Sequence, residues 1–169
     1  MWFELRKENL DFAKRAPLVY GSEAELSAPR PLVFTTFVEP QSWKHWFPNV
    51  RDAAYATPPP HGVGTIREAH VGRTYWVEEM IAWDEGVRWA WTVTRASVPF
   101  ATAQVESFEF MDAGGGTRVR WTLALEPRLL ARLGAPFAPR VITRLFHRAM
   151  QNLSVYVQRA ARETQEERR

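Results

Sequence analysis

The sequence contains no cysteine and very little lysine. The absence of cysteine excludes disulfides, thiolate nucleophiles and cysteine-ligated metal sites. Of the 22 lysines and arginines, only Lys7, Lys14 and Lys44 are lysines. So strong a preference for arginine is typical of GC-rich bacterial genomes, and the arginine content by itself therefore does not indicate nucleic-acid binding.

Long apolar segments and export signals are missing as well. No stretch approaches the ~18 consecutive apolar residues of a membrane span. The first 17 residues mix charged with apolar side chains, unlike a secretory signal. We therefore expect a cytoplasmic protein.

Motifs for metal ions, phosphate groups and common nucleophiles are also absent. The four histidines, His45, His61, His70 and His147, do not stand at the spacings of paired helical metal ligands. The glycines at 62–64 and 114–116 lack the lysine and the following helix of a phosphate-binding loop. There is no G-x-S-x-G nucleophile motif. We expect no metal and no cofactor, and motifs assign no catalytic residue.

What is present is the composition of one globular domain. Hydrophobic residues make up 46% of the 169 residues and charged residues 24%, and eight tryptophans are an unusually high number. In the segments around Trp89 and Trp121, apolar and polar residues alternate, which is typical of an antiparallel sheet with one dry face. Turn residues bound seven expected strands, at residues 19–28, 50–55, 65–71, 74–83, 87–98, 101–111 and 117–125.

Two kinds of helix are expected. After the first strand, residues 32–37 form a short helical stripe, and residues 41–47 form a second short helix. Its Trp43, Trp46 and Phe47 share one face because of their i, i+3, i+4 spacing. Near the C-terminus, apolar residues recur at helical spacing and predict a long amphipathic helix over residues 139–162. The charged residues 163–169 are expected to form a frayed tail.

The dry face of the sheet and the apolar stripe of the last helix each need a partner. The simplest arrangement is an α+β fold in which a curved, seven-stranded antiparallel sheet wraps around the C-terminal helix, with two short helices after the first strand. This order resembles the START-like, or helix-grip, superfamily, which includes polyketide cyclase/dehydrase-like and lipid-transfer proteins. The resemblance covers residues 18–162, leaving residues 1–17 as an N-terminal extension. It rests on EPQSWKHWFPNV after the first strand, GVGTIR at 62–67, VEEMIAWDEG at 77–86, GGGTRVRWTLALEP at 114–127 and the final helix.

The resemblance implies a cavity between the sheet and the last helix that holds an apolar small molecule, either lipid-like or aromatic and polyketide-like. Bulky side chains form the walls of such a cavity or simply fill the core. We expect Trp46 in the core and Trp43 or Phe47 nearer the entrance. The candidate ligand-binding residues are Trp43, Trp46, Phe47, Trp76, Glu78, Trp89, Trp91, Phe108, Trp121, Phe146 and Met150.

Two adjacent carboxylates, Glu78 and Glu79, lie in the middle of an expected strand. Because neighbours in a strand point to opposite faces, one of them points into the interior, where it must be paired or protonated. Its position in VEEMIAWDEG favours Glu78, with Arg67 or Arg88 as the partner. The pair is either a structural ion pair or part of a catalytic site.

Two functions stay open at this stage. The protein either binds or transports an apolar small molecule, or it is a cyclase or dehydratase for a polyketide-like substrate. The enzyme would use Glu78, Tyr75 or an interior arginine as acid or base, and it needs two interior polar groups close together. A regulatory or stress-protein module is a third alternative.

A basic stripe runs along the expected C-terminal helix. Arg140, Arg144 and Arg148 stand at i, i+4 and i+8, where like charges repel. The stripe is either an ordinary solvated face or a weak contact with an anionic membrane surface. Nucleic acid is not expected as a partner, because no exposed aromatic residue is interleaved with the stripe.

Overall fold

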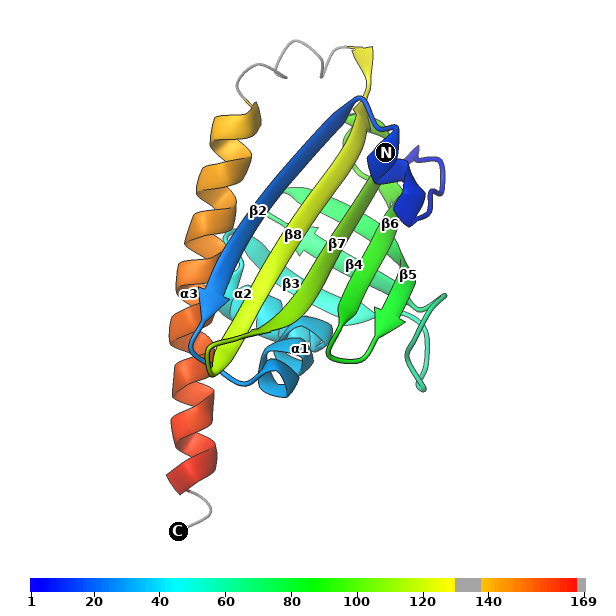
Figure 1. Ribbon diagram of the computed structural model, residues 1–169. Helices are drawn as coiled ribbons and strands as arrows, with labels where there is room; N and C mark the ends of the chain where they lie inside the picture. Colours follow the sequence, from blue (N-terminus) through cyan, green and yellow to red (C-terminus); the bar gives the residue numbers. More distant parts are fainter. Residues whose placement is uncertain (130–137, 167–169) are drawn as a thin grey trace.

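The computed structural model describes residues 1–129 and 138–166, where an antiparallel sheet curves around a long helix (Figure 1). The arrangement confirms the predicted α+β fold. The strands are β1 (Phe3–Glu4), β2 (Leu18–Leu26), β3 (Val50–Tyr55), β4 (Ile66–Val71), β5 (Thr74–Asp84), β6 (Arg88–Ala96), β7 (Ala101–Ala113) and β8 (Gly116–Pro127). The helices are η1 (Leu10–Lys14) and η2 (Pro40–Ser42), both of the 3-10 type, and α1 (Arg30–Val38), α2 (Trp43–Trp46) and α3 (Ala138–Glu166).

The main sheet has the strand order β2-β8-β7-β6-β5-β4-β3. Each strand from β3 to β8 is hydrogen-bonded to the next in the sequence, and β2 closes the series against β8. The register of β5 against β6 shifts twice, between Val77 and Glu78 and between Met80 and Ala82. Such bulges bend a strand and increase its twist, which favours the curvature of the sheet around α3.

The helices form where the sequence provides suitable ends. Pro29 caps α1 and Pro31 lies in its first turn, where the missing N–H of proline costs no hydrogen bond. The short helices η2 and α2 follow as predicted for residues 41–47. Helix α3 continues to Glu166, four residues beyond its predicted end, so part of the expected charged tail is helical.

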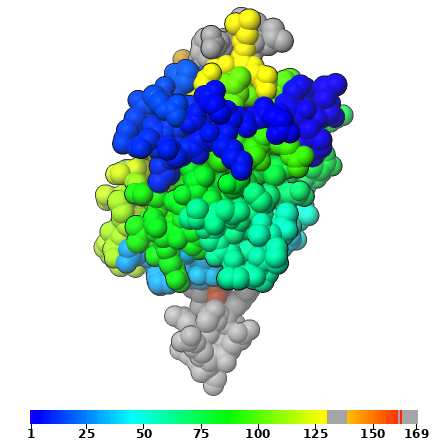
Figure 2. Space-filling view, turned by 90° about the vertical axis from the view of Figure 1, so that its right-hand side faces the viewer, coloured from blue at the N-terminus to red at the C-terminus, as the bar shows by residue number. Residues whose placement is uncertain are grey.

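The N-terminal segment, the first 17 residues, joins the sheet through β1 and then covers part of its outer face, the face directed away from α3, with η1. The two residues of β1 pair with Arg95 and Ala96 of β6, which adds a short strand that the sequence pattern did not predict. Phe12 of η1 is 1% exposed and packs against Ala103, Val105 and Ala124. Figure 2 shows this N-terminal segment, in dark blue, lying across the strands coloured green.

The inner face of the sheet carries the core. One part of it is filled by what we call the aromatic cluster, in which neighbouring ring centroids lie 4.8–5.3 Å apart. Helix α3 covers the inner face with Phe146, Ala149, Leu153 and Val157, which are at most 1% exposed. The aromatic cluster consists of Phe34, Phe37, Trp46, Phe108 and Phe110.

Candidate functional site: an apolar cavity with an interior polar cluster

A cavity of about 180 Å³ lies between the inner face of the sheet and α3. An engineered cavity of roughly 150 Å³ in another protein binds benzene, so this one has room for a single substituted aromatic ring. Most of the lining is apolar, but four polar side chains contribute to it: one from β4, one from β5 and two from β7. The lining residues are Trp43, Phe47, Val50, Ala53, Arg67, Ala69, Val71, Trp76, Glu78, Trp91, Gln104, Glu106, Trp121, Leu123, Ile142 and Leu145.

The predicted ligand-binding residues divide into two groups. Those that line the cavity are Trp43, Phe47, Trp76, Glu78, Trp91 and Trp121. The others are at most 4% exposed, lie outside the cavity lining and fill the core: Trp46, Trp89, Phe108, Phe146 and Met150. Trp46 is therefore a core residue, as expected from the sequence. Ligand binding by the first group stays a prediction.

The interior carboxylate is Glu78, and its partner is Arg67. The two residues face each other across β4 and β5, and Arg67 Nε donates to Glu78 Oε2 at 2.6 Å. Their side chains are only 2% and 9% exposed. Glu79 instead pairs with Lys7 of the N-terminal segment, and the alternative partner Arg88 pairs with Glu109.

Three tryptophans surround the buried guanidinium group of Arg67. Its central carbon lies 4.6 Å from the ring centroid of Trp43, 4.8 Å from that of Trp89 and 4.5 Å from that of Trp91. A cation over an aromatic face is attracted by the electrons of the ring, and more strongly where water is excluded. These rings compensate in part for the lost hydration of Arg67, which gives the tryptophans a role beyond space filling.

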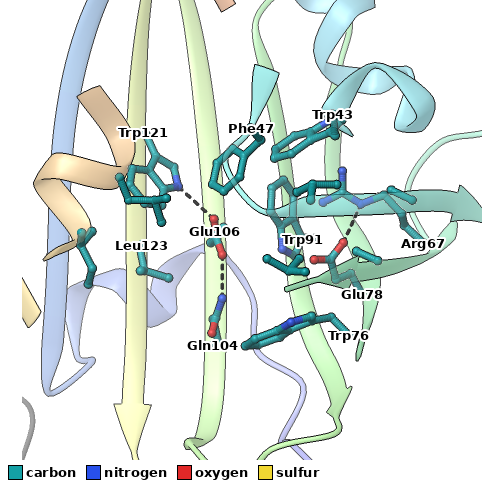
Figure 3. Close-up of a pocket in the computed structure, with 16 residues that line it drawn as sticks. Trp43, Phe47, Arg67, Trp76, Glu78, Trp91, Gln104, Glu106, Trp121 and Leu123 are labelled. Atoms are coloured by element: carbon teal, nitrogen blue, oxygen red, sulfur yellow. Dashed lines mark hydrogen bonds and ion pairs between the residues drawn. The ribbon is translucent and has the colours of Figure 1, made fainter. Parts of the chain in front are cut away.

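A second interior carboxylate, Glu106 of β7, was missed by the sequence analysis. Its Oε2 accepts a hydrogen bond from Trp121 Nε1 at 3.0 Å, and its Oε1 accepts one from Gln104 Nε2 at 2.6 Å (Figure 3). Within the described residues, no lysine or arginine forms an ion pair with Glu106. The described residues that line the cavity thus include two carboxylates, Glu78 and Glu106, but only one cation, Arg67.

The environment of Glu106 changes its acidity. Burial raises the pKa of Glu106 to about 7, and the negative charge of Glu78 adds to the rise. The hydrogen bond from Trp121, the positive charge of Arg67 and the hydrogen bond from Gln104 oppose it without cancelling it. Near neutral pH this carboxyl group therefore exists in both protonation states and is able to exchange a proton with a bound molecule.

Strand alternation contained the signal for Glu106. Phe108 was already a candidate for the interior, and residues two and four positions before it in the same strand share its face. That rule places Glu106 and Gln104 inside. Tyr75, in contrast, was considered as an acid or base but is 49% exposed and stacks on His70 at 4.1 Å, outside the cavity lining.

Hydrogen-bond donors without partners are concentrated near the same region. Four buried side-chain polar atoms have no hydrogen-bond partner among the described residues: Tyr20 Oη, Arg67 Nη1, Trp89 Nε1 and Trp91 Nε1. Arg67 and Trp91 line the cavity. A buried donor without an acceptor costs about 1–3 kcal/mol, so these two groups favour an acceptor in the cavity.

The basic stripe of α3 lies on the surface, where Arg140, Arg144 and Arg148 are all exposed. Contact with an anionic membrane surface stays a prediction. None of the helices in residues 1–129 and 138–166 is both long and apolar enough to cross a membrane.

Comparisons with known proteins agree with this architecture. Residues 21–158 match the family described as "Polyketide cyclase / dehydrase and lipid transport". An uncharacterized protein of Mycobacterium bovis is 26% identical over 123 residues, which cover 72% of this chain and 74% of the relative. An uncharacterized protein of Mycobacterium tuberculosis matches with the same values.

Two solved structures share the fold. A START superfamily protein from Mycobacterium smegmatis matches with a TM-score of 0.71 and 12% identity, over 84% of this chain and 98% of the other. A protein from Thermus thermophilus matches with a TM-score of 0.70 and 19% identity, over 85% and 99% of the two chains. At such low identities these matches show the fold alone.

Proposed function

The chain belongs to the polyketide cyclase / dehydrase and lipid transport family, and on that basis we propose that it binds a small, largely apolar molecule between the sheet and α3. The observation that supports this proposal is the cavity itself. Filling a space of 180 Å³ would add about 4 kcal/mol of stability at ~24 cal/mol per Å³. Because protein cores are otherwise close-packed, an unfilled space of this size favours a bound molecule as its occupant.

The size of the cavity narrows the choice of ligand. With 180 Å³, the cavity suits a molecule of about one substituted ring, whereas most sites for drug-sized molecules measure roughly 300–1,000 Å³. An extended lipid chain or a polyketide of several rings would need a larger space. We therefore favour a ring-sized aromatic molecule over the lipid-like alternative.

Two neighbouring alanines of β3 provide a matched test. Ala53 is 4% exposed and lines the cavity, whereas Ala54 is exposed and points to the other face. Ala53→Phe should fill the cavity and weaken the binding of toluene by at least about tenfold, and Ala54→Phe should leave it unchanged. Calorimetric titration measures both, and native mass spectrometry of the purified protein identifies any molecule that co-purifies. Equal effects of the two substitutions, or no binding to the wild type, would contradict the proposal.

Acid–base catalysis is a second candidate function, and Glu106 is the observation that favours it. An enzyme needs interior polar groups that converge, and the cavity brings Glu106 together with the Arg67–Glu78 pair. A carboxylate at this position is suited to removing a proton from carbon next to a carbonyl group, with the electron pair moving onto the carbonyl oxygen. Deuterium exchange into the methyl group of acetophenone tests this step, and Glu106→Gln should abolish any catalysed exchange while toluene binding persists.

A further inference from the structure

The polar atoms of the cavity are complementary to a hydroxyl group on a ring. We propose that the bound molecule is a phenol of single-ring size, whose hydroxyl group lies between the Glu106 carboxylate and the Trp91 indole N–H. This inference rests on the proposed binding function and specifies the class of ligand.

Glu106 and Trp91 are neighbours on the sheet. They are register partners across β7 and β6, a relation that sets Cβ atoms about 5 Å apart. In Figure 3, Trp91 lies between Glu106 and the Arg67–Glu78 pair. A group bound over this part of the sheet is therefore within reach of both side chains.

The hydrogen-bonding capacities of the two side chains are opposite. Glu106 is acceptor-only when ionised, and its two oxygens, which receive Trp121 and Gln104, have lone pairs to spare. Among the residues that the structure describes, Trp91 Nε1 is a donor without an acceptor, and Arg67 Nη1 is a second one. A hydroxyl group donates one hydrogen bond and accepts others, so a single oxygen atom satisfies both requirements.

Other polar groups match less well. A carboxylate on the ligand would be repelled by Glu106 and Glu78, and Arg67 already pairs with Glu78. An ammonium group cannot accept from Trp91 and would be repelled by Arg67. A carbonyl group accepts from Trp91 but matches only the protonated form of Glu106, because it gives the ionised form no donor.

The remaining walls suit an aromatic ring. Phe47, Trp121, Leu123, Ile142 and Leu145 are apolar lining residues that surround the polar cluster. Aromatic side chains pack against a ligand ring in stacked or edge-to-face geometry. One ring with one hydroxyl group also agrees with the size of the cavity.

The charges that face Glu106 determine how pH should affect binding. They are those of Arg67 on β4 and Glu78 on β5. Helix α3 contributes only Ile142 and Leu145 to the cavity, α2 contributes Trp43, and the arginines of the α3 stripe are exposed. Glu106 is therefore the group in the cavity that we expect to titrate near pH 7.

The sign of the pH effect differs between a phenol and an apolar analogue. A phenol O–H that donates to ionised Glu106 lowers the pKa of this carboxyl group, so phenol should bind more tightly at pH 8 than at pH 6. Toluene, which has nearly the same shape, removes water from Glu106 and offers no donor. It raises the pKa of Glu106 and should bind more tightly at pH 6.

The experiment titrates the full chain with phenol and with toluene at pH 6 and pH 8. Nuclear magnetic resonance follows the indole N–H signals of the eight tryptophans, and Trp91→Phe identifies the signal of Trp91. We expect phenol, but not toluene, to shift the Trp91 signal strongly. We also expect Glu106→Gln to reduce the preference for phenol over toluene by about tenfold at pH 8, because a hydrogen bond to a charged group is lost.

The outcomes separate this inference from the function on which it rests. If both molecules bind with the same pH dependence, or if phenol leaves the Trp91 signal in place, the ligand is not a phenol held in this way. The proposed binding function would still stand if Ala53→Phe then blocks both molecules. If neither molecule binds to the wild-type protein, the inference and the proposed function fail together. If a variant does not fold, the pH dependence of phenol and toluene binding to the wild-type protein still tests the inference, and the absence of any binding to the wild type still contradicts the proposed function.

Discussion

The aromatic cluster and the cavity occupy the same face of the same sheet, yet one is filled and the other is hollow. Strand β7 contributes to both: Phe108 and Phe110 belong to the aromatic cluster, and Gln104 and Glu106 line the cavity. Within seven residues of one strand, aromatic side chains are replaced by polar side chains that are hydrogen-bonded to other side chains. The change from bulky apolar to hydrogen-bonded polar residues on one strand face therefore marks where close packing ends and a site begins.

The largest effect should come from opening a space in the filled region. Phe108 is 1% exposed, lies 4.8 Å from Phe37 between ring centroids and stacks on Trp91. Phe108→Ala should lower the free energy of unfolding by about 3–5 kcal/mol, as measured by chemical denaturation. Leu123→Ala, which enlarges a space that already exists, should cost about 2 kcal/mol, at the low end for such a change. Equal losses would remove the distinction between the two regions.

The next effect concerns the ion pair at the cavity. Glu78→Leu leaves Arg67 buried without its counter-charge and should cost about 3 kcal/mol in urea denaturation. Adding Arg67→Met should restore much of that stability, because an apolar pair of similar volume avoids the loss of hydration.

An exposed ion pair on the outer face serves as the control. Glu25 pairs with Arg118 at 2.7 Å, with side chains 63% and 46% exposed. Glu25→Leu should change the stability by less than about 1 kcal/mol. If Glu78→Leu is as mild as this control, the interior pair is not shielded from water as its burial indicates.

The smallest effect is the pH dependence that Glu106 confers. Its pKa is about 7 in the folded protein and 4.5 ordinarily, so the folded state binds the proton more tightly. The free energy of unfolding should therefore fall as pH rises from about 4.5 to 7. Glu106→Gln removes this loss. Between pH 5 and pH 8 the free energy of unfolding of the variant should therefore rise relative to that of the wild type by on the order of 2 kcal/mol, allowing for partial screening in the cavity. Parallel stability curves for the two proteins would show that Glu106 titrates normally.

Local periodicity was sufficient to predict most elements of the fold. The strand at residues 50–55 was predicted with the bounds that it has. Alternation required one of Glu78 and Glu79 to be interior, and the position in VEEMIAWDEG favoured Glu78, which is the buried one. Local sequence pattern could not decide whether Arg67 or Arg88 is its partner, because the partner depends on which residue of another strand lies opposite Glu78. That register is a property of the assembled sheet.

Other parts of the site could not be inferred from the sequence for different reasons. The cavity volume is the small difference between two large volumes, the one enclosed by sheet and helix and the one filled by side chains. A local sequence pattern does not determine this difference. The pairing of β1 with β6 joins residues more than ninety positions apart through two residues that show no strand pattern. Glu106 was within reach of alternation, because it shares a strand face with Phe108, which was already a candidate for the interior.

The contacts of the N-terminal segment have a consequence for the time order of folding. Arg6 donates its backbone N–H to Thr102 at 2.8 Å and pairs with Glu126 through its side chain. At synthesis rates of about 5–20 residues per second, residue 126 follows residue 6 by roughly 6–24 s. Contacts of such long sequence separation form late, because a large loop must close first. Residues of the N-terminal segment are thus synthesised before the strands that they contact but form their contacts late, and Phe12 is buried only after β7 and β8 have come together.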